Sequence, residues 1–176
     1  MRFFIIVFIF SFFISFQLTA APHPMMGSAL INQVGSGSVF SQMGFQIKNL
    51  PSDWILKTPL NSNVLELGPG NNARKSILSF MSEKINLKTD LEKYVRQYLR
   101  DYNQYGFEVV NLQSLKQGNL NSVIVDLNEK NKATRSRQIF YKKEDQIIMA
   151  MCLDTFEQFD KTILTCNKVL ESFQWR

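Results

Sequence analysis

The chain has few of the residues on which enzymes most often depend. Its 176 residues include one histidine, His23, and two cysteines, Cys152 and Cys166. Nucleophilic catalysis by serine or cysteine needs a positioned imidazole, and His23 lies in a proline-containing stretch with no second histidine and no cysteine near it. A transition-metal site likewise needs several converging ligands. We therefore expect no catalytic histidine, no metal site and no cofactor.

Two other kinds of site have little support in the sequence. The turn-forming run at residues 68–72 lacks the Gly-Lys-Ser/Thr ending of a phosphate-binding loop, and we interpret it as a turn. A carboxylate pair of the kind that hydrolases use stays open. The acidic residues that can meet in space are Asp126, Glu129, Glu144 and Asp145. Because acidic residues in turns are usually solvated, we expect a protein that is not an enzyme, with a secreted hydrolase or a carbohydrate-binding effector as the alternative.

The first twenty residues have the pattern of an export signal. A single charge on Arg2 precedes an apolar run rich in Phe and Ile, and small residues follow. The run at residues 3–18 is shorter than the roughly 20 residues that a membrane-spanning helix needs, which argues against an uncleaved anchor. We predict cleavage after Ala20, and no cysteine near this site offers a lipid anchor. The mature protein is then exported to the bacterial periplasm or the extracellular space, without a transmembrane anchor.

The predicted mature chain of about 156 residues is long enough for one domain with a sizeable core. Without Arg2 it has 19 basic and 15 acidic residues, which gives a net charge of +4. Nucleic-acid-binding domains usually show a dense basic stripe, so we expect no nucleic-acid partner. Residues 21–43 have no charged residue apart from His23, and their prolines and Gly-Ser run predict a flexible lead-in. The alternative is that part of this segment anchors on the domain through Ile31, Val34, Val39 and Phe40.

The two cysteines predict a disulfide. In an oxidising compartment an even pair is more often bridged than free, although two separate buried thiols are the alternative. One unbroken helix over residues 154–166 would carry Cys166 about 18 Å along its axis, whereas a bridge needs Cα atoms within about 7 Å. We therefore predict a Cys152–Cys166 bridge, a helix that begins near Asp160, and a bend over residues 153–159.

Residues 44–176 show the alternation of strands and the periodicity of helices that an α/β (α+β) domain requires. We expect strands at 45–48, 54–57, 64–67, 74–83, 107–112, 122–127, 135–141 and 146–152. The later strands are largely apolar on both faces, so both faces must be covered, and their short connections predict antiparallel hairpins. The expected architecture is an antiparallel sheet between helices, an α/β/α sandwich.

Two amphipathic helices are expected to supply the outer layers. The first starts at a Thr-x-x-Glu capping box, Thr89 to Glu92, and stops at Gly106; the second covers residues 155–175. The first places four tyrosines on the face that also carries its leucines: Tyr94, Tyr98, Tyr102 and Tyr105. We interpret them as core packing with hydroxyls at the boundary, and keep a platform for a sugar or peptide as the alternative. Trp175 is expected to seal the end of the second helix, with a recognition aromatic as the alternative.

Several short segments resemble the PsbP/Mog1/DcrB-like superfamily. Residues 44–47 lead into Leu-Pro-Ser-Asp-Trp at 50–54, which resembles the opening strand and Pro-x-x-Trp turn of that superfamily, and later landmarks lie at 106–110, 137–140 and 172–175. The resemblance spans residues 44–176. It implies an α/β/α sandwich used as a binding or accessory module in photosystem assembly, small-GTPase binding or the bacterial envelope, and it supplies no catalytic motif. The export signal favours an exported bacterial member.

The best candidate surface in the sequence is a basic hairpin. Arg135 and Arg137 lie two residues apart on one expected strand and therefore share a face, where their guanidinium groups can bind carboxylate or phosphate. The full set is Lys130, Lys132, Arg135, Arg137, Lys142 and Lys143. We expect a non-enzymatic accessory protein whose partner is a protein or an anionic component of the envelope, such as a lipid headgroup. The alternative for the hairpin is a solvated edge that charge keeps soluble.

Overall fold

The computed structural model describes residues 38–58, 63–71, 77–118 and 120–176. The predicted leader at residues 1–20 lies outside them, as does most of the predicted lead-in, including His23, Ile31 and Val34. Among the described residues, no helix combines the length and the apolar character that a membrane crossing requires.

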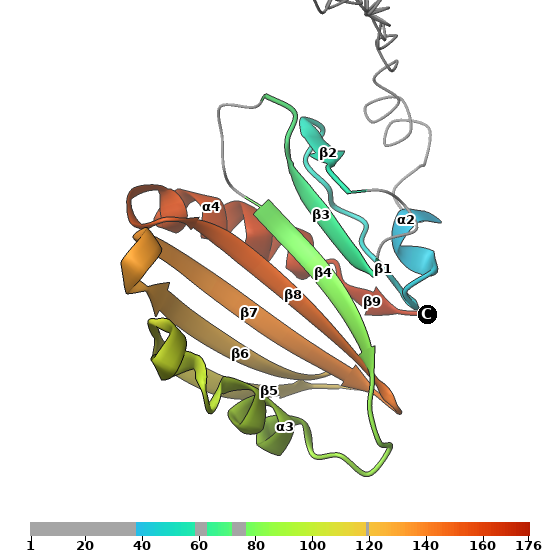
Figure 1. Ribbon diagram of the computed structural model, residues 1–176. Coiled ribbons are helices and arrows are strands. Elements are labelled where there is room, and N and C mark those ends of the chain that lie inside the picture. The colour runs from blue at the N-terminus through green and yellow to red at the C-terminus, as the bar shows by residue number, and fades with distance from the viewer. Residues whose placement is uncertain (1–37, 59–62, 72–76, 119) are drawn as a thin grey trace, which may run out of the picture.

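A seven-stranded antiparallel sheet forms the centre of the molecule (Figure 1). Its order is β2-β3-β4-β8-β7-β6-β5, so β4 lies beside β8, and the hairpin series from β5 to β8 forms one half of the sheet. The strands are β2 (Trp54–Leu56), β3 (Val64–Pro69), β4 (Ile77–Lys84), β5 (Phe107–Gln117), β6 (Leu120–Glu129), β7 (Thr134–Lys143) and β8 (Gln146–Thr155). The antiparallel sheet expected from the alternating pattern is therefore confirmed.

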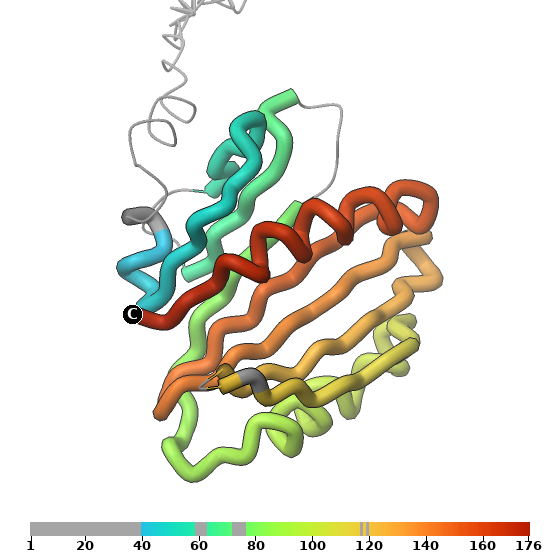
Figure 2. The backbone as a smooth tube through the Cα atoms, turned by 180° about the vertical axis from the view of Figure 1, so that it is seen from behind, coloured from blue at the N-terminus to red at the C-terminus, as the bar shows by residue number. Residues whose placement is uncertain are grey.

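One helix packs on each face of this sheet (Figures 1 and 2). Helix α3 (Leu91–Leu99) lies over β6 and β7, and its Val95 is fully buried against the side chains of that face. Helix α4 (Phe156–Leu170) lies over β7 and β8 on the opposite face. The expected layers of helix, sheet and helix are present, and each face has its own hydrophobic core.

Helix α3 differs from its predicted form at both ends. Its N-cap is Asp90 rather than Thr89, and the Asp90 carboxylate accepts a hydrogen bond from the backbone N–H of Lys93 at 2.8 Å. The α-helix stops at Leu99, and a short 3-10 helix, η1 (Tyr102–Tyr105), follows before Gly106. Aspartate and asparagine at positions 101 and 103 favour turns over helix interiors, which explains why the predicted long helix divides in two.

The predicted disulfide between Cys152 and Cys166 is present, with the Cα atoms 6.3 Å apart. The predicted bend is wrong, because β8 continues to Thr155 and α4 begins directly at Phe156. Helix α4 runs back along β8, the strand that precedes it, and packs against it. Three strand steps advance the chain by about 10 Å, and ten helical steps return it by about 15 Å. Cys166 therefore comes to lie over Cys152 without the predicted bend over residues 153–159.

The two ends of the described chain meet in a second, two-stranded sheet. Strand β1 (Phe45–Gln46) pairs with β9 (Gln174–Trp175), so Trp175 lies in a strand beyond the end of α4, where it packs against Phe173 at 5.4 Å and against the core. The hydroxyl of Ser172 accepts hydrogen bonds from the backbone N–H groups of Lys48 and Asn49, at 3.1 Å each. We call this arrangement the terminal clasp. It holds the first and last described segments together (Figure 2).

The core also includes residues before the expected start of the domain at Gly44. Short helix α2 (Ser38–Ser41) places the ring of Phe40 5.2 Å from that of Phe45 and 5.4 Å from that of Phe80. Phe40 is 1% exposed. This agrees with the alternative interpretation for this one residue of the lead-in.

Candidate interaction surfaces

The structure does not bring the six predicted basic residues together in one patch. Lys130 and Lys132 lie in η2 (Lys130–Lys132), the turn before β7, and Arg135 and Arg137 follow on β7. Lys142 and Lys143 end the same strand. Eight residues separate Arg135 from Lys143, which corresponds to roughly 26 Å along a strand. The hairpin therefore has two basic ends rather than one basic surface.

The basic residues at the first end are paired with carboxylates of the same chain. Arg137 donates two hydrogen bonds to Asp126, at 2.7 Å and 3.0 Å, and the Asp126 bond raises the pKa of Arg137. Arg135 bonds to Asp160 at 3.1 Å and lies over the ring of Phe159, 4.8 Å from its centre. The remaining pairs are Lys130 with Glu108 at 3.4 Å and Lys132 with Glu129 at 2.9 Å. An external anion would compete with these carboxylates.

At the other end, the lysines bond to carbonyl oxygens instead. The ammonium group of Lys142 donates to the backbone oxygen of Leu87 at 3.1 Å, and that of Lys143 donates to the backbone oxygen of Arg176 at 2.6 Å. Two acidic residues, Glu144 and Asp145, directly follow these lysines in the turn between β7 and β8, so this end also carries negative charge.

The four acidic residues considered as a carboxylate pair are not brought together. Asp126 and Glu129 lie at one end of the hairpin, where each bonds to a basic residue, while Glu144 and Asp145 lie in the turn at the other end. Among the described residues there is also no group of three or more His, Cys, Asp or Glu side chains arranged to hold a metal ion.

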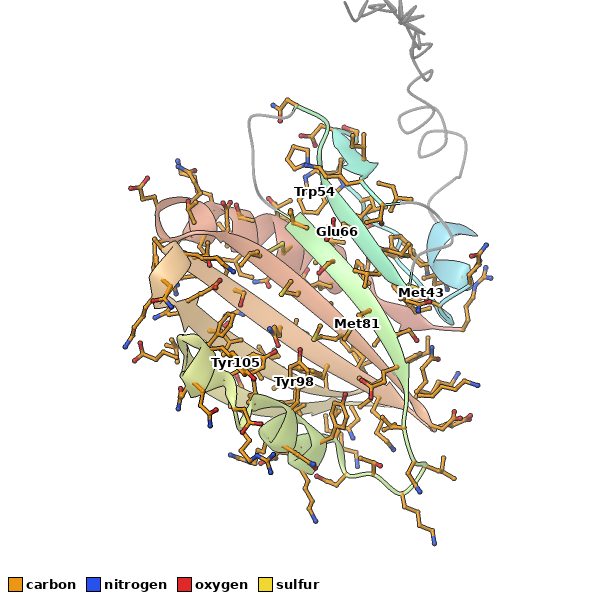
Figure 3. All side chains as sticks on the ribbon, in the orientation of Figure 1. Met43, Trp54, Glu66, Met81, Tyr98 and Tyr105 are labelled. Atoms are coloured by element: carbon orange, nitrogen blue, oxygen red, sulfur yellow. A yellow bond between two sulfur atoms is a disulfide. The ribbon has the colours of Figure 1, made fainter. Side chains whose placement is uncertain are left out.

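Most of these tyrosines pack against the hydrophobic core, as expected. Tyr98 packs edge-on against Phe140 at 5.4 Å, and Tyr102 packs against Phe107 at 5.1 Å. The pKa of Tyr102 is raised above its usual value, mainly by burial. Tyr105 differs, because its side chain is 69% exposed (Figure 3). The helix face is therefore not an open row of aromatic rings.

Sequence reasoning missed the exposed edge strand β5. This strand is eleven residues long and has a neighbour on one side only, β6. Seven large hydrophobic side chains are exposed among the described residues, and β5 with the residues just before it supplies four: Tyr105, Val109, Val110 and Leu115. We call these four residues the edge patch. The four side chains follow one edge of the sheet, with Val109 on the α3 face and Leu115 on the α4 face.

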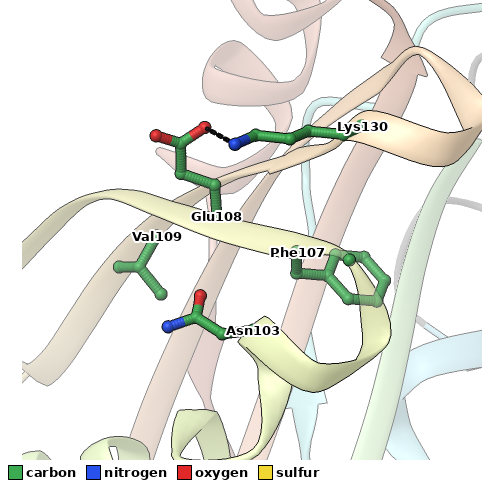
Figure 4. Close-up of a pocket in the computed structure, with 6 residues that line it drawn as sticks. Asn103, Phe107, Glu108, Val109 and Lys130 are labelled. Carbon is green, nitrogen blue, oxygen red and sulfur yellow. Dashed lines mark ion pairs between the residues drawn. The ribbon is translucent and has the colours of Figure 1, made fainter.

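A pocket of about 490 Å³ opens where η1 meets β5 (Figure 4). Its lining residues are Asn103, Gly106, Phe107, Glu108, Val109 and Lys130. Gly106 makes the turn possible, because its φ of 83° is a conformation that side chains disfavour and an added Cβ would lie 2.7 Å from the Asn131 amide. The lining combines an apolar ring and valine with an amide and an exposed ion pair. The pocket can thus accept a mixed polar and apolar group next to the edge patch.

No protein-family model and no curated protein matches this chain. Solved structures do match it. A cyanobacterial PsbP (CyanoP) from Synechocystis sp. PCC 6803 superimposes with a TM-score of 0.59 at 12% identity, over 77% of this chain and 89% of that one. This chain has the PsbP/Mog1/DcrB-like fold. The resemblance seen in residues 44–176 is thereby confirmed for the fold.

Two further structures share the PsbP-like fold with this chain. PA94 from Pseudomonas aeruginosa has a TM-score of 0.55 at 13% identity and covers 75% of this chain and 97% of that one. LpqN of Mycobacterium tuberculosis, a protein involved in cell envelope biogenesis, has a TM-score of 0.54 at 13% identity, over 74% of this chain and 83% of that one. At 12% and 13% identity, these likenesses show the fold that this chain shares with the three proteins.

Proposed function

We propose that this chain is an exported, non-enzymatic accessory protein of the bacterial periplasm or extracellular space, and that it binds a partner protein through β5. Export is supported by the leader pattern of residues 1–20 and by the buried disulfide, a bond that persists in oxidising compartments. The envelope role of LpqN supports the same location by analogy of fold.

The observation that carries the binding role is the edge patch beside its pocket. The edge of a sheet offers unpaired backbone donors and acceptors to an extended segment of another protein. The exposed side chains of Val110 and Leu115 provide apolar contact along that edge, and the pocket at Glu108 and Lys130 provides a place for one side chain of the partner. The backbone contacts supply affinity, and the pocket supplies selectivity.

Site-specific photocrosslinking tests this role. A photoreactive amino acid replaces Leu115 on β5 in one variant and Leu164 on the outer face of α4 in another, because both leucines are exposed. In the producing cells, we expect one defined protein adduct from position 115 and none from position 164. Val110→Lys should reduce the adduct from position 115. Equal adducts from both positions, or none from 115, would contradict the proposal.

An anionic partner at the Lys142 and Lys143 end is a second candidate, because the ammonium groups of both lysines bond to backbone oxygens rather than to side-chain carboxylates. The double variant Lys142→Gln/Lys143→Gln should weaken retention on an anionic resin or vesicle and reduce its salt dependence. Lys130→Gln/Lys132→Gln is the matched control, since those two lysines are paired with Glu108 and Glu129. Equal loss in both double variants would argue against a specific anionic site.

A further inference from the structure

Three methionines gather on the α3 face of the sheet, where β4 lies beside β8. Met81 and Met149 are direct partners in the β4–β8 register, and Met151 follows two positions after Met149 on the same face. We call these three residues the methionine cluster. The one other methionine among the described residues, Met43, belongs to the core on the opposite face.

The register brings the three sulfur atoms within reach of one point above the sheet. Cβ atoms of directly opposite residues, such as Met81 and Met149, lie about 5 Å apart, and diagonal neighbours, such as Met81 and Met151, lie about 7 Å apart. A methionine sulfur lies two bonds beyond Cβ on a freely rotating, unbranched side chain. The three thioether groups can therefore converge on a single small ligand.

The methionine cluster is accessible from solvent. Met81, on β4, and Met151, on β8, are partly exposed, whereas Met149 is 9% exposed and packs in the core under α3 (Figure 3). Helix α3 packs mainly on β6 and β7, so it does not cover the whole of this face. An ion can thus approach the cluster without any opening of the core.

The sulfur of Met151 is already held by a hydrogen bond. The side-chain amide of Gln138, on β7, donates to this sulfur at 3.8 Å, and Gln138 is itself 4% exposed. A thioether sulfur has two lone pairs, so the second stays available to a metal ion. Bonds of this kind behind a ligand atom orient it toward its metal.

The chemistry of the cluster favours a soft, singly charged cation. Thioether sulfur is a neutral, soft ligand that selects Cu(I), whereas oxygen ligands suit hard cations. The two cysteines cannot compete as thiolates, because they form the Cys152–Cys166 disulfide. Among the described residues of β4 and β8 on this face, only Glu83 is charged, and its carboxylate accepts a hydrogen bond from Tyr94 at 2.7 Å. The nearest strand charge is therefore negative, which suits a cation.

We propose that the methionine cluster binds one Cu(I) ion per chain through its three sulfur atoms. The expectation of no metal site was based on histidine and cysteine ligands, and a thioether site needs neither. The cluster lies at the junction of β4 and β8, away from the β5 edge. The proposal is therefore independent of the proposed function.

Anaerobic titration with Cu(I), in competition with the chromophoric chelator bicinchoninate, tests the proposal. We expect the native chain to withdraw one equivalent. Met81→Leu, Met149→Leu and Met151→Leu should each weaken binding by about tenfold or more, because the loss of even an outer-shell partner costs about 10- to 100-fold in metal affinity. Leucine keeps the apolar volume, so these variants should stay folded, which circular dichroism checks. Met43→Leu is the matched control and should bind like the native chain.

Nuclear magnetic resonance of the methionine methyl groups locates the ion in the native chain. On addition of Ag(I), a soft ion with the charge of Cu(I), the methyl signals of Met81, Met149 and Met151 should shift while that of Met43 stays in place. Unshifted cluster signals would overturn the proposal, as would undiminished Cu(I) binding by the triple leucine variant of the cluster. Photocrosslinking from position 115 should be the same in the native chain and in the triple variant, so its result decides the proposed function separately.

Discussion

Arg137 on β7 and Asp126 on β6 face each other in a two-bonded ion pair, with nitrogen–oxygen distances of 2.7 Å and 3.0 Å. Their side chains are 27% and 16% exposed, so the pair is partly removed from water. Bidentate pairs of this geometry are stronger than ordinary surface pairs. The sequence suggested Arg137 as a binding group. In the structure, its ion pair with Asp126 links β6 and β7.

Removal of this pair should destabilise the fold. In Asp126→Asn the guanidinium loses its carboxylate while staying partly buried, and we expect a loss of about 1 to 2 kcal/mol after allowance for solvent screening. The control is Asp160→Asn, whose carboxylate is 84% exposed in its pair with Arg135 and should contribute about 0.5 kcal/mol or less. Urea unfolding measures both. Equal losses in the two variants would contradict this ranking.

The disulfide should be both stabilising and protected from reductants. It joins Cys152 and Cys166, which are 14 positions apart in the sequence, and for a loop of this size the chain-entropy relation gives about 3 kcal/mol. Neither cysteine is exposed, so reduction of the folded protein should require opening of α4 from β8. Thermal unfolding with and without a reductant measures the effect. The variant Cys152→Ala/Cys166→Ala should not respond to the reductant, and an unchanged melting temperature in the native sequence would contradict the prediction.

Burial of Tyr141 should make the protein sensitive to alkali. Its ring stacks on Phe173 with centroids 4.0 Å apart, and burial raises the pKa of its hydroxyl above the usual value. A raised folded-state pKa stabilises the fold fully below the unfolded pKa of about 10, and this contribution falls as the pH rises from there toward the folded pKa. Tyr141→Phe keeps the stacked ring. It should match the native stability near pH 7 and lose less stability above about pH 10. Parallel unfolding curves for both proteins at high pH would be evidence against this cause.

Gly44 should tolerate a side chain less well than Gly118. Both have positive φ, at 81° and 56°, so alanine is strained at either position. An added Cβ at Gly44 would also lie 2.9 Å from the Gln146 side chain, which hydrogen bonds to Met43 and Ser82, whereas nothing lies within 4 Å at Gly118. We expect Gly44→Ala to cost about 2 kcal/mol and Gly118→Ala about 1 kcal/mol. Denaturant midpoints compare them, and a larger loss at Gly118 would show that Gln146 moves aside freely.

The sequence predicted the sheet because its strands show their pattern locally. In β6, Val123 and Val125 point to the face under α3 while Ile124 points to the other, and each pattern can be seen within a few residues. The terminal clasp could not be predicted in this way. Phe45 and Trp175 are partners across almost the whole chain, and neither local sequence specifies the other.

The candidate site was harder to predict than the fold. The charges of Arg135 and Arg137 are visible in the sequence, but their partners Asp160 and Asp126 are identified only by the packing of α4 and β6 against β7. The edge patch was missed for a similar reason. Val109 and Leu115 have the same pattern as buried strand residues, and only the strand order shows that β5 has one neighbour.

The terminal clasp implies an order of events during biogenesis. Gln46 bonds to Gln174, 128 positions later in the chain, and Phe45 stacks on Phe173. During translation, β1 is therefore synthesised long before β9, its partner strand. The aromatic cluster around Phe45 is incomplete until synthesis is almost finished. This part of the core therefore forms last, after the consecutive hairpins β5 to β8 have been synthesised.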